Sequence, residues 1–190
     1  MRPPYQTASG CVDILMHTME RYFNQCDNME LTDGISESLM RTVMKNAKIL
    51  KDEPDNYDAR AEVMWAGSLS HNGLTGCGTD GGDWATHKME HEVGGLFDAR
   101  PARFAQFATH VLGVTAGADD TETALKGIKA MEDFYHSIDM PVSLSELGVT
   151  PTPEQIRTMA EKCDISTHHN AGKVKHLSVE DMVAIYTTAL

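Results

Sequence analysis

Residues 10–23 of the chain read GCVDILMHTMERYF. Six apolar side chains in this stretch recur at intervals of three and four residues, which is the spacing of one face of an α-helix. They are Val12, Leu15, Met16, Met19, Tyr22 and Phe23. The stretch therefore predicts an amphipathic helix that turns an apolar stripe toward a core.

The same period predicts helices along most of the chain. Apolar residues share a helical face in five further sets: Ile35, Leu39, Val43, Ala47 and Leu50; Ala61, Met64 and Trp65; Phe104, Phe107, Ala108 and Val111; Leu125, Ile128, Met131, Tyr135 and Ile138; Val179, Met182, Val183 and Tyr186. Runs of alternating β-branched residues are missing, and so is the rhythm of strand, helix and strand. The sequence therefore predicts an all-α fold, a helical bundle in a single domain.

Helix start signals precede several of these sets. Pro101 suits the first turn of a helix, and Asp119 with Asp120 provides N-terminal caps. Residues 152–155, TPEQ, have the form of a capping box, and Ser178 precedes the last helix. The stretches 75–82 and 168–175 are typical of loops within one domain.

Composition excludes some partners. The chain has 190 residues, of which 41% are hydrophobic, and no window approaches the roughly 18 apolar residues of a membrane span. Its start lacks the apolar stretch of a signal peptide. With 16 Lys and Arg against 28 Asp and Glu, the formal net charge is −12, which repels phosphate backbones. We therefore expect neither a membrane nor a nucleic acid as partner.

The cysteines indicate a cellular compartment. Cys11, Cys26, Cys77 and Cys163 are widely spaced and form no CxxC pair. This pattern argues against a disulfide framework and a cysteine zinc site, and favours a reducing cytoplasm.

Residues 76–81, GCGTDG, match the GxGxxG pattern of dinucleotide-binding turns. The pattern binds a pyrophosphate only where a strand leads into it and a helix follows. Residues 66–72 predict the end of a helix, so we interpret the motif as a loop between helices.

Two pairs of residues have the spacing of metal ligands. Asp13 and His17 are four residues apart in the first predicted helix, and His87 and His91 repeat the spacing in a helix predicted to start near Trp84. Side chains four residues apart project from one helical face and can reach one ion. One carboxylate with two or three imidazoles suits zinc or ferrous iron better than calcium or magnesium. From spacing alone, a surface hydrogen bond or a chance pair remains an alternative.

Several blocks, in order, carry a resemblance to a known family. Residues 10–22 resemble the metal-binding helix of the iron-containing (group III) alcohol dehydrogenases, above all of the butanol dehydrogenase-like branch. Further blocks extend the similarity, with one break, from about Pro4 to the C-terminus: 56–60 (NYDAR), 64–66 (MWA), 70–74 (SHNGL) and 82–92 (GDWATHKMEHE).

The resemblance implies a fold and a site. Family members interconvert alcohols and aldehydes with NAD or NADP, and they join a nucleotide-binding α/β domain to a C-terminal helical, dehydroquinate synthase-like domain that holds the metal. The similarity concerns the helical domain only, so we expect one metal-binding domain over residues 1–190 without the N-terminal nucleotide-binding domain. It implies Asp13, His17 and His87 as ligands of Fe²⁺ or Zn²⁺, and His91 as a catalytic-cleft residue near the nicotinamide and substrate.

One departure from the family pattern concerns the fourth ligand, a histidine in a loop beyond His87. Residues 94–104 read GGLFDARPARF and lack it. The family pattern resumes at Pro101, which indicates that the loop and the following helix have been excised. His91 either replaces the missing ligand or keeps the cleft position that the resemblance implies.

The other histidines have simpler interpretations. We expect His71 to pack or to hydrogen-bond at a helix end near the cleft, and His110 and His136 to lie on helix surfaces. The late group His168, His169 and His176 is expected to bind metal only adventitiously.

The leading hypothesis is the metal-binding part of an NAD(P)-dependent alcohol dehydrogenase acting on a small alcohol or aldehyde, inactive as an isolated chain. The alternatives are a truncated, non-catalytic helical protein with a weak metal site, and a helical scaffold that binds another protein through exposed apolar surface. The sequence leaves open whether copies associate as a homo-oligomer.

Overall fold

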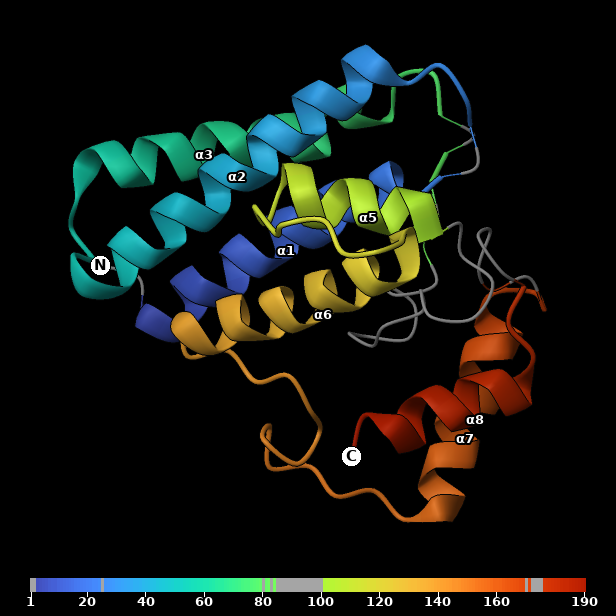
Figure 1. The fold of residues 1–190 in the computed structure, drawn as a ribbon. Coiled ribbons are helices and arrows are strands. Elements are labelled where there is room, and N and C mark those ends of the chain that lie inside the picture. Colours follow the sequence, from blue (N-terminus) through green and yellow to red (C-terminus); the bar gives the residue numbers. More distant parts are fainter. Residues whose placement is uncertain are drawn as a thin grey trace.

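The computed structural model describes residues 3–24, 26–79, 81–82, 84, 101–169, 171 and 176–190. These residues form helices and no strand, so the all-α prediction is confirmed (Figure 1). In chain order the helices are α1 (Pro4–Tyr22), α2 (Glu30–Asp52), α3 (Tyr57–His71), the short 3₁₀ helix η1 (Leu74–Gly76), α5 (Pro101–His110), α6 (Asp120–Ser137), α7 (Pro153–Ser166) and α8 (Val179–Thr188).

Helix start signals lie where the sequence predicts them. Pro101 is the first residue of α5, and the Asp119 side chain accepts a hydrogen bond from a backbone N–H at the start of α6. Thr152 caps α7 in a capping box. Ser178 forms a second capping box at the start of α8 with Asp181. Such caps satisfy backbone donors that the first turn of a helix leaves unpaired.

A first core, which we call the main core, is built from α1, α2, α3, α5 and α6 (Figure 1). The predicted stripe of α1 enters it, with Leu15 fully buried and Tyr22 only 1% exposed. The predicted stripe of α2 meets it through Leu39, Val43 and Ala47, and Met40, which was not predicted, is fully buried as well. The helix that carries the first pair of candidate ligands is therefore held on several sides.

A second core, which we call the C-terminal core, belongs to α7 and α8. These two helices lie side by side next to the end of the chain (Figure 1). Its buried members are Ile156, Ala160, Cys163, Ala171, Leu177, Met182, Ile185 and Tyr186. The backbone N–H of Leu144 donates to the carbonyl of Ala189, so the segment after α6 is tied to the end of α8.

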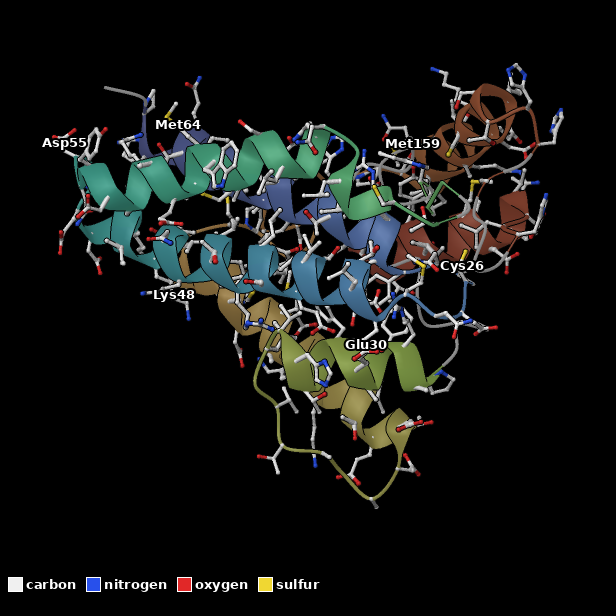
Figure 2. All side chains as sticks on the ribbon, turned by 90° about the horizontal axis from the view of Figure 1, so that it is seen from above. Cys26, Glu30, Lys48, Asp55, Met64 and Met159 are labelled. Atoms are coloured by element: carbon white, nitrogen blue, oxygen red, sulfur yellow. The ribbon has the colours of Figure 1, made fainter. Side chains whose placement is uncertain are left out.

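The prediction for the buried face of α3 is wrong. Met64 is 73% exposed and Trp65 is 64% exposed, and Ala61 is exposed as well. Figure 2 shows Met64 on the side of α3 that faces away from α2. The residues of α3 that are buried are small: Ala59, Ala66 and Ser70.

Close helix packing explains this reversal. A Cβ atom added to Gly67 would lie 3.1 Å from the Cδ1 atom of Ile14 on α1. Small residues let α3 approach its neighbours, so the large apolar side chains remain on the outer face. On α6 the predicted stripe is also partly exposed, since Leu125 is 53% exposed and Phe134 is buried instead.

A buried ion pair fastens α5 to α1 and α2. Both carboxylate oxygens of Asp33 accept hydrogen bonds from the Arg103 guanidinium, one of them at 2.6 Å. The same guanidinium donates to the carbonyl of Tyr22 at 2.6 and 3.0 Å and lies 4.0 Å from the centre of the Tyr22 ring. Helix α6 approaches α5 closely at Gly127, where an added Cβ would lie 2.6 Å from the Cβ of Ala108.

Within the described residues, no helix combines the length and the apolar character that crossing a membrane requires.

Candidate metal centre

Asp13 and His17 lie one turn apart on α1. The Nε2 atom of His17 is 3.7 Å from the Oδ1 atom of Asp13. The His17 side chain is 17% exposed and that of Asp13 is 55% exposed. The pair therefore begins at the edge of the main core and opens to the outside.

His71 joins this pair from the end of α3. Its Nε2 atom is 3.5 Å from the Oδ2 atom of Asp13, and its ring centre is 4.1 Å from that of His17. One donor atom from each of the three residues lies within 4.8 Å of the other two, and no other such group of His, Cys, Asp and Glu occurs in the described part of the chain. The sequence predicted His71 at a helix end, which is confirmed, but it missed the contact with Asp13.

Arg21 brings the two helices together at this point. Its Nη1 atom donates to the carbonyl of His17 on α1 and to the carbonyl of Ser70 on α3, both at 2.8 Å. The guanidinium carbon also lies 5.0 Å from the ring centre of Trp84, and that ring meets His17 edge to face at 5.6 Å. Arg21 and Trp84 thus fix the position of His17.

A close backbone approach places the loop that precedes Trp84. Gly82 has a φ of +79°, and a Cβ atom there would lie 2.6 Å from the carbonyl oxygen of Glu20. Only glycine permits this contact with the last turns of α1. Helix α3 and η1, and no strand, lead into the described residues of the GxGxxG stretch, which confirms the prediction that a helix precedes the motif.

The donor set fits a transition metal. One carboxylate and two imidazoles suit Zn²⁺ or Fe²⁺, whereas Ca²⁺ and Mg²⁺ prefer oxygen ligands throughout. Bond lengths of 2.0–2.1 Å in a tetrahedral site put neighbouring donors about 3.3 Å apart. The Nε2 atom of His71 lies 3.5 Å from one Asp13 oxygen, and that of His17 lies 3.7 Å from the other. The three donor atoms all lie within 4.8 Å of one another, which is a wider spacing than in a formed tetrahedral centre.

Cys11 lies two residues before Asp13 on the buried side of α1 and does not belong to the donor set. Burial raises the pKa of its thiol to about 11, against a weaker opposing effect of Arg60. Metal ions bind the thiolate, which this environment disfavours.

His87 and His91 belong to residues 85–100, which lie outside the described residues. The roles of both histidines therefore stay predictions. The surface positions predicted for His110 and His136 are confirmed. His110 contacts the carboxylate of Glu37, and His136 contacts that of Glu146, both at 3.0 Å. In the late loop, the Nδ1 atom of His169 lies 2.6 Å from Asp164.

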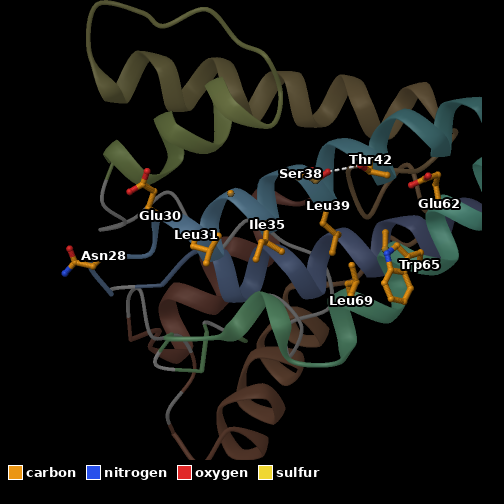
Figure 3. Close-up of a pocket in the computed structure, with 12 residues that line it drawn as sticks. Asn28, Glu30, Leu31, Ile35, Ser38, Leu39, Thr42, Glu62, Trp65 and Leu69 are labelled. Carbon is orange, nitrogen blue, oxygen red and sulfur yellow. Dashed lines mark hydrogen bonds between the residues drawn. The ribbon is translucent and has the colours of Figure 1, made fainter.

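A shallow groove of about 760 Å³ runs between α2 and α3 (Figure 3). Its lining does not include Asp13, His17 or His71. Its walls include the apolar side chains of Leu31, Ile35 and Leu39, with Trp65 at one end. Glu30 and Glu62 supply carboxylates, but the lining includes neither histidine nor cysteine. The groove therefore offers no transition-metal site.

The chain is similar to known proteins over nearly all of its length. The profile described as "Fe-containing alcohol dehydrogenase family, C-terminal" matches residues 7–100 and 98–190. NADH-dependent butanol dehydrogenase A of Clostridium acetobutylicum is 30% identical over 205 residues, which cover 97% of this chain and 52% of that protein. NADPH-dependent aldehyde reductase YqhD of Escherichia coli is 32% identical over 167 residues, covering 77% of this chain and 43% of that protein.

A solved structure supports the same relationship. The substrate- and cofactor-free form of the E. coli aldehyde reductase superimposes with a TM-score of 0.88 and 29% identity, covering 100% of this chain and 54% of that one. The chain thus spans about half the length of the relatives it matches. It belongs to the Fe-containing alcohol dehydrogenase family and corresponds to the family's C-terminal domain.

Proposed function

We propose that this chain is the metal-binding part of an NAD(P)-dependent oxidoreductase that interconverts small alcohols and aldehydes. The observation that carries the proposal is the meeting of Asp13 and His17 on one face of α1, inside the segment that the family profile matches. The names of the relatives support the chemistry, since one is an NADH-dependent butanol dehydrogenase and another an NADPH-dependent aldehyde reductase.

In this proposal Asp13, His17 and His87 hold Fe²⁺ or Zn²⁺, and His91 lines the cleft beside the reacting groups. When bound, the ion supplies Lewis-acid activation of the alcohol oxygen, and the nicotinamide is the hydride acceptor. Trp84 contacts the His17 ring edge to face, and Arg21 binds the backbone carbonyl of His17, so both support the residue that stands beside the Asp13 carboxylate. The half-exposed Asp13 leaves the centre open to a small substrate.

The break in the family pattern bears on the fourth ligand. The family profile matches in two segments that meet at residues 98–100, next to the point where the sequence lacks the expected histidine. This supports the interpretation that a segment present in relatives is missing here. A centre with one ligand fewer should bind its ion less tightly, because the charge of the ion is less well compensated.

The cysteines support a reducing compartment. All four are free thiols, and Cys11 and Cys163 are buried. A cytoplasmic location is consistent with this state, since oxidising compartments favour disulfides.

Metal analysis tests the proposal. Protein purified without chelator should contain iron or zinc, and calorimetric titration of the apoprotein with Zn²⁺ should show one site. Asp13→Ala and His17→Ala should each remove that binding. His110→Ala is the matched control, because His110 lies on α5 beside Glu37 and outside the centre. If the Asp13 and His17 variants bound Zn²⁺ as the unaltered protein does, the proposal would be refuted.

A further inference from the structure

Two oxygen atoms lie beside the Nδ1 atom of the His71 ring. It is 3.0 Å from the carbonyl oxygen of Gly67 and 2.7 Å from the Oγ atom of Ser70. The Ser70 hydroxyl is also within hydrogen-bond distance of the Gly67 carbonyl, at 2.9 Å. These contacts turn Nδ1 toward the backbone of α3 and leave Nε2 as the ring nitrogen that faces away from it.

This Nε2 atom faces another acceptor. It lies 3.5 Å from the Oδ2 atom of Asp13, and an ionised carboxylate has no proton to donate. The second oxygen of Asp13 faces the Nε2 atom of His17 at 3.7 Å. Two imidazole nitrogens are thus gathered around one carboxylate, and one donor atom from each of the three residues lies within 4.8 Å of the other two.

We propose that His71 is a further ligand of the metal ion held by Asp13 and His17, an inference that rests on the metal-binding function proposed above. Metal-binding histidines usually donate their other ring N–H to a backbone carbonyl or a carboxylate, which fixes the tautomer and aims the ring. The Gly67 carbonyl oxygen, 3.0 Å from the Nδ1 atom of His71, is placed to accept such a hydrogen bond. Arg21 holds the end of α3 in place through its hydrogen bond to the carbonyl of Ser70.

His71 adds an imidazole to the centre from a second helix. Residues 94–104 carry no histidine, so that stretch cannot supply one. His71 instead brings a donor from the end of α3 to the pair that Asp13 and His17 form on α1.

Titration with Co²⁺ tests the assignment, because its visible absorption reports both affinity and coordination geometry. His71→Ala should weaken Co²⁺ binding at least about 10-fold and change the spectrum. Even the loss of a side chain that only supports a metal ligand lowers metal affinity by about this factor. His110→Ala should leave both unchanged. Far-UV circular dichroism of each variant checks that the helices are retained.

The outcomes separate this inference from the proposed function. If His71→Ala bound Co²⁺ with unchanged affinity and spectrum while Asp13→Ala lost binding, His71 would be excluded as a ligand and the metal centre would stand. If Asp13→Ala also bound normally, both ideas would fail.

A second measurement does not depend on whether a variant folds. In ¹⁵N NMR of the unaltered protein, adding Zn²⁺ should shift the Nε2 resonance of His71 and leave its Nδ1 protonated. An unchanged His71 Nε2 resonance beside a shifted His17 resonance would overturn the assignment.

Discussion

Replacing Arg103 with alanine should remove a large part of the stability of the main core. The Arg103 side chain is 15% exposed and that of Asp33 is 10% exposed, so the pair is largely withdrawn from water. Burial alone lowers the pKa of Arg103, but the hydrogen bond and the charge of Asp33 outweigh it and raise the pKa. The guanidinium thus stays charged beside its carboxylate.

The magnitude follows from what Arg103→Ala leaves behind. Among the described residues, the Asp33 carboxylate would retain one long hydrogen bond, from the Gln106 amide at 3.4 Å. An uncompensated buried charge of this kind costs about 3–5 kcal/mol, out of a total stability of about 5–15 kcal/mol. In a chain of this size the loss corresponds to a fall in melting temperature of roughly 6–20 °C. Arg103→Lys should restore only part of the loss. Lysine returns the positive charge, but one ammonium cannot bond both carboxylate oxygens as the guanidinium does.

Urea unfolding followed by tryptophan fluorescence measures this loss. Trp65 and Trp84 are the two tryptophans of the chain, and neither lies in the C-terminal core, so the signal reports on the main core. Lys129→Ala is the control: it removes an exposed ion pair with Asp133 on α6 and should leave the stability nearly unchanged, because solvent screens exposed charges. A cost below 1 kcal/mol for Arg103→Ala would refute the reasoning, and so would strict additivity with Asp33→Ala.

Three further outcomes are expected. Gly127→Ala should destabilise the protein by about 1–3 kcal/mol in thermal unfolding, because its Cβ would overlap that of Ala108, and Ala108→Gly should restore stability. Should the single variant melt higher, the close contact would be disproved. Burial, together with the hydrogen bond to Glu37, raises the pKa of Tyr22 above its usual 10.0. Its contribution to stability is therefore complete below pH 10 and is lost as the pH rises above it. Tyr22→Phe should flatten the decline in unfolding free energy above pH 10, and an equally steep decline would contradict this assignment. The 190-residue chain alone, loaded with metal, should form no NADH or NADPH from butanol, because positioning the nicotinamide is worth about 7–11 kcal/mol of the barrier and a net charge of −12 repels a dinucleotide. Turnover that disappears in His87→Ala would contradict this expectation.

Local patterns predicted the helices well because the signals that start a helix lie within a few residues. Pro101, Asp119 and Thr152 each act on the turn they begin, so their role can be read from the sequence. The buried face of α3 could not be read in this way. Its apolar period highlights Met64 and Trp65, whereas contact with α1 and α2 selects the smaller side chains.

Part of the candidate metal centre could likewise be predicted from local sequence, and part of it could not. Asp13 and His17 share a helical turn, and their spacing alone indicates that they can act together. His71 follows Asp13 by 58 residues, and the two meet through the packing of α3 on α1, which the hydrogen bond from Arg21 to Ser70 reinforces. Buried Asp33 and Glu37 on α2 gave no signal either, since a carboxylate in the sequence does not reveal that Arg103 and Tyr22 will cover it.

The presence of two cores has a consequence for how the protein responds to heat. A ligand stabilises only the cooperative unit that contains its site, by about 2.7 kcal/mol when its free concentration is 100 times Kd. Asp13, His17 and His71 all belong to helices of the main core, whereas α7 and α8 pack around apolar residues of their own. A calorimetric scan should therefore show two heat-absorption peaks, of which only one moves upward with metal concentration. The transition of the helix pair α7–α8 would then be an internal reference. The difference between the two transition temperatures would report how much of the centre is occupied by metal.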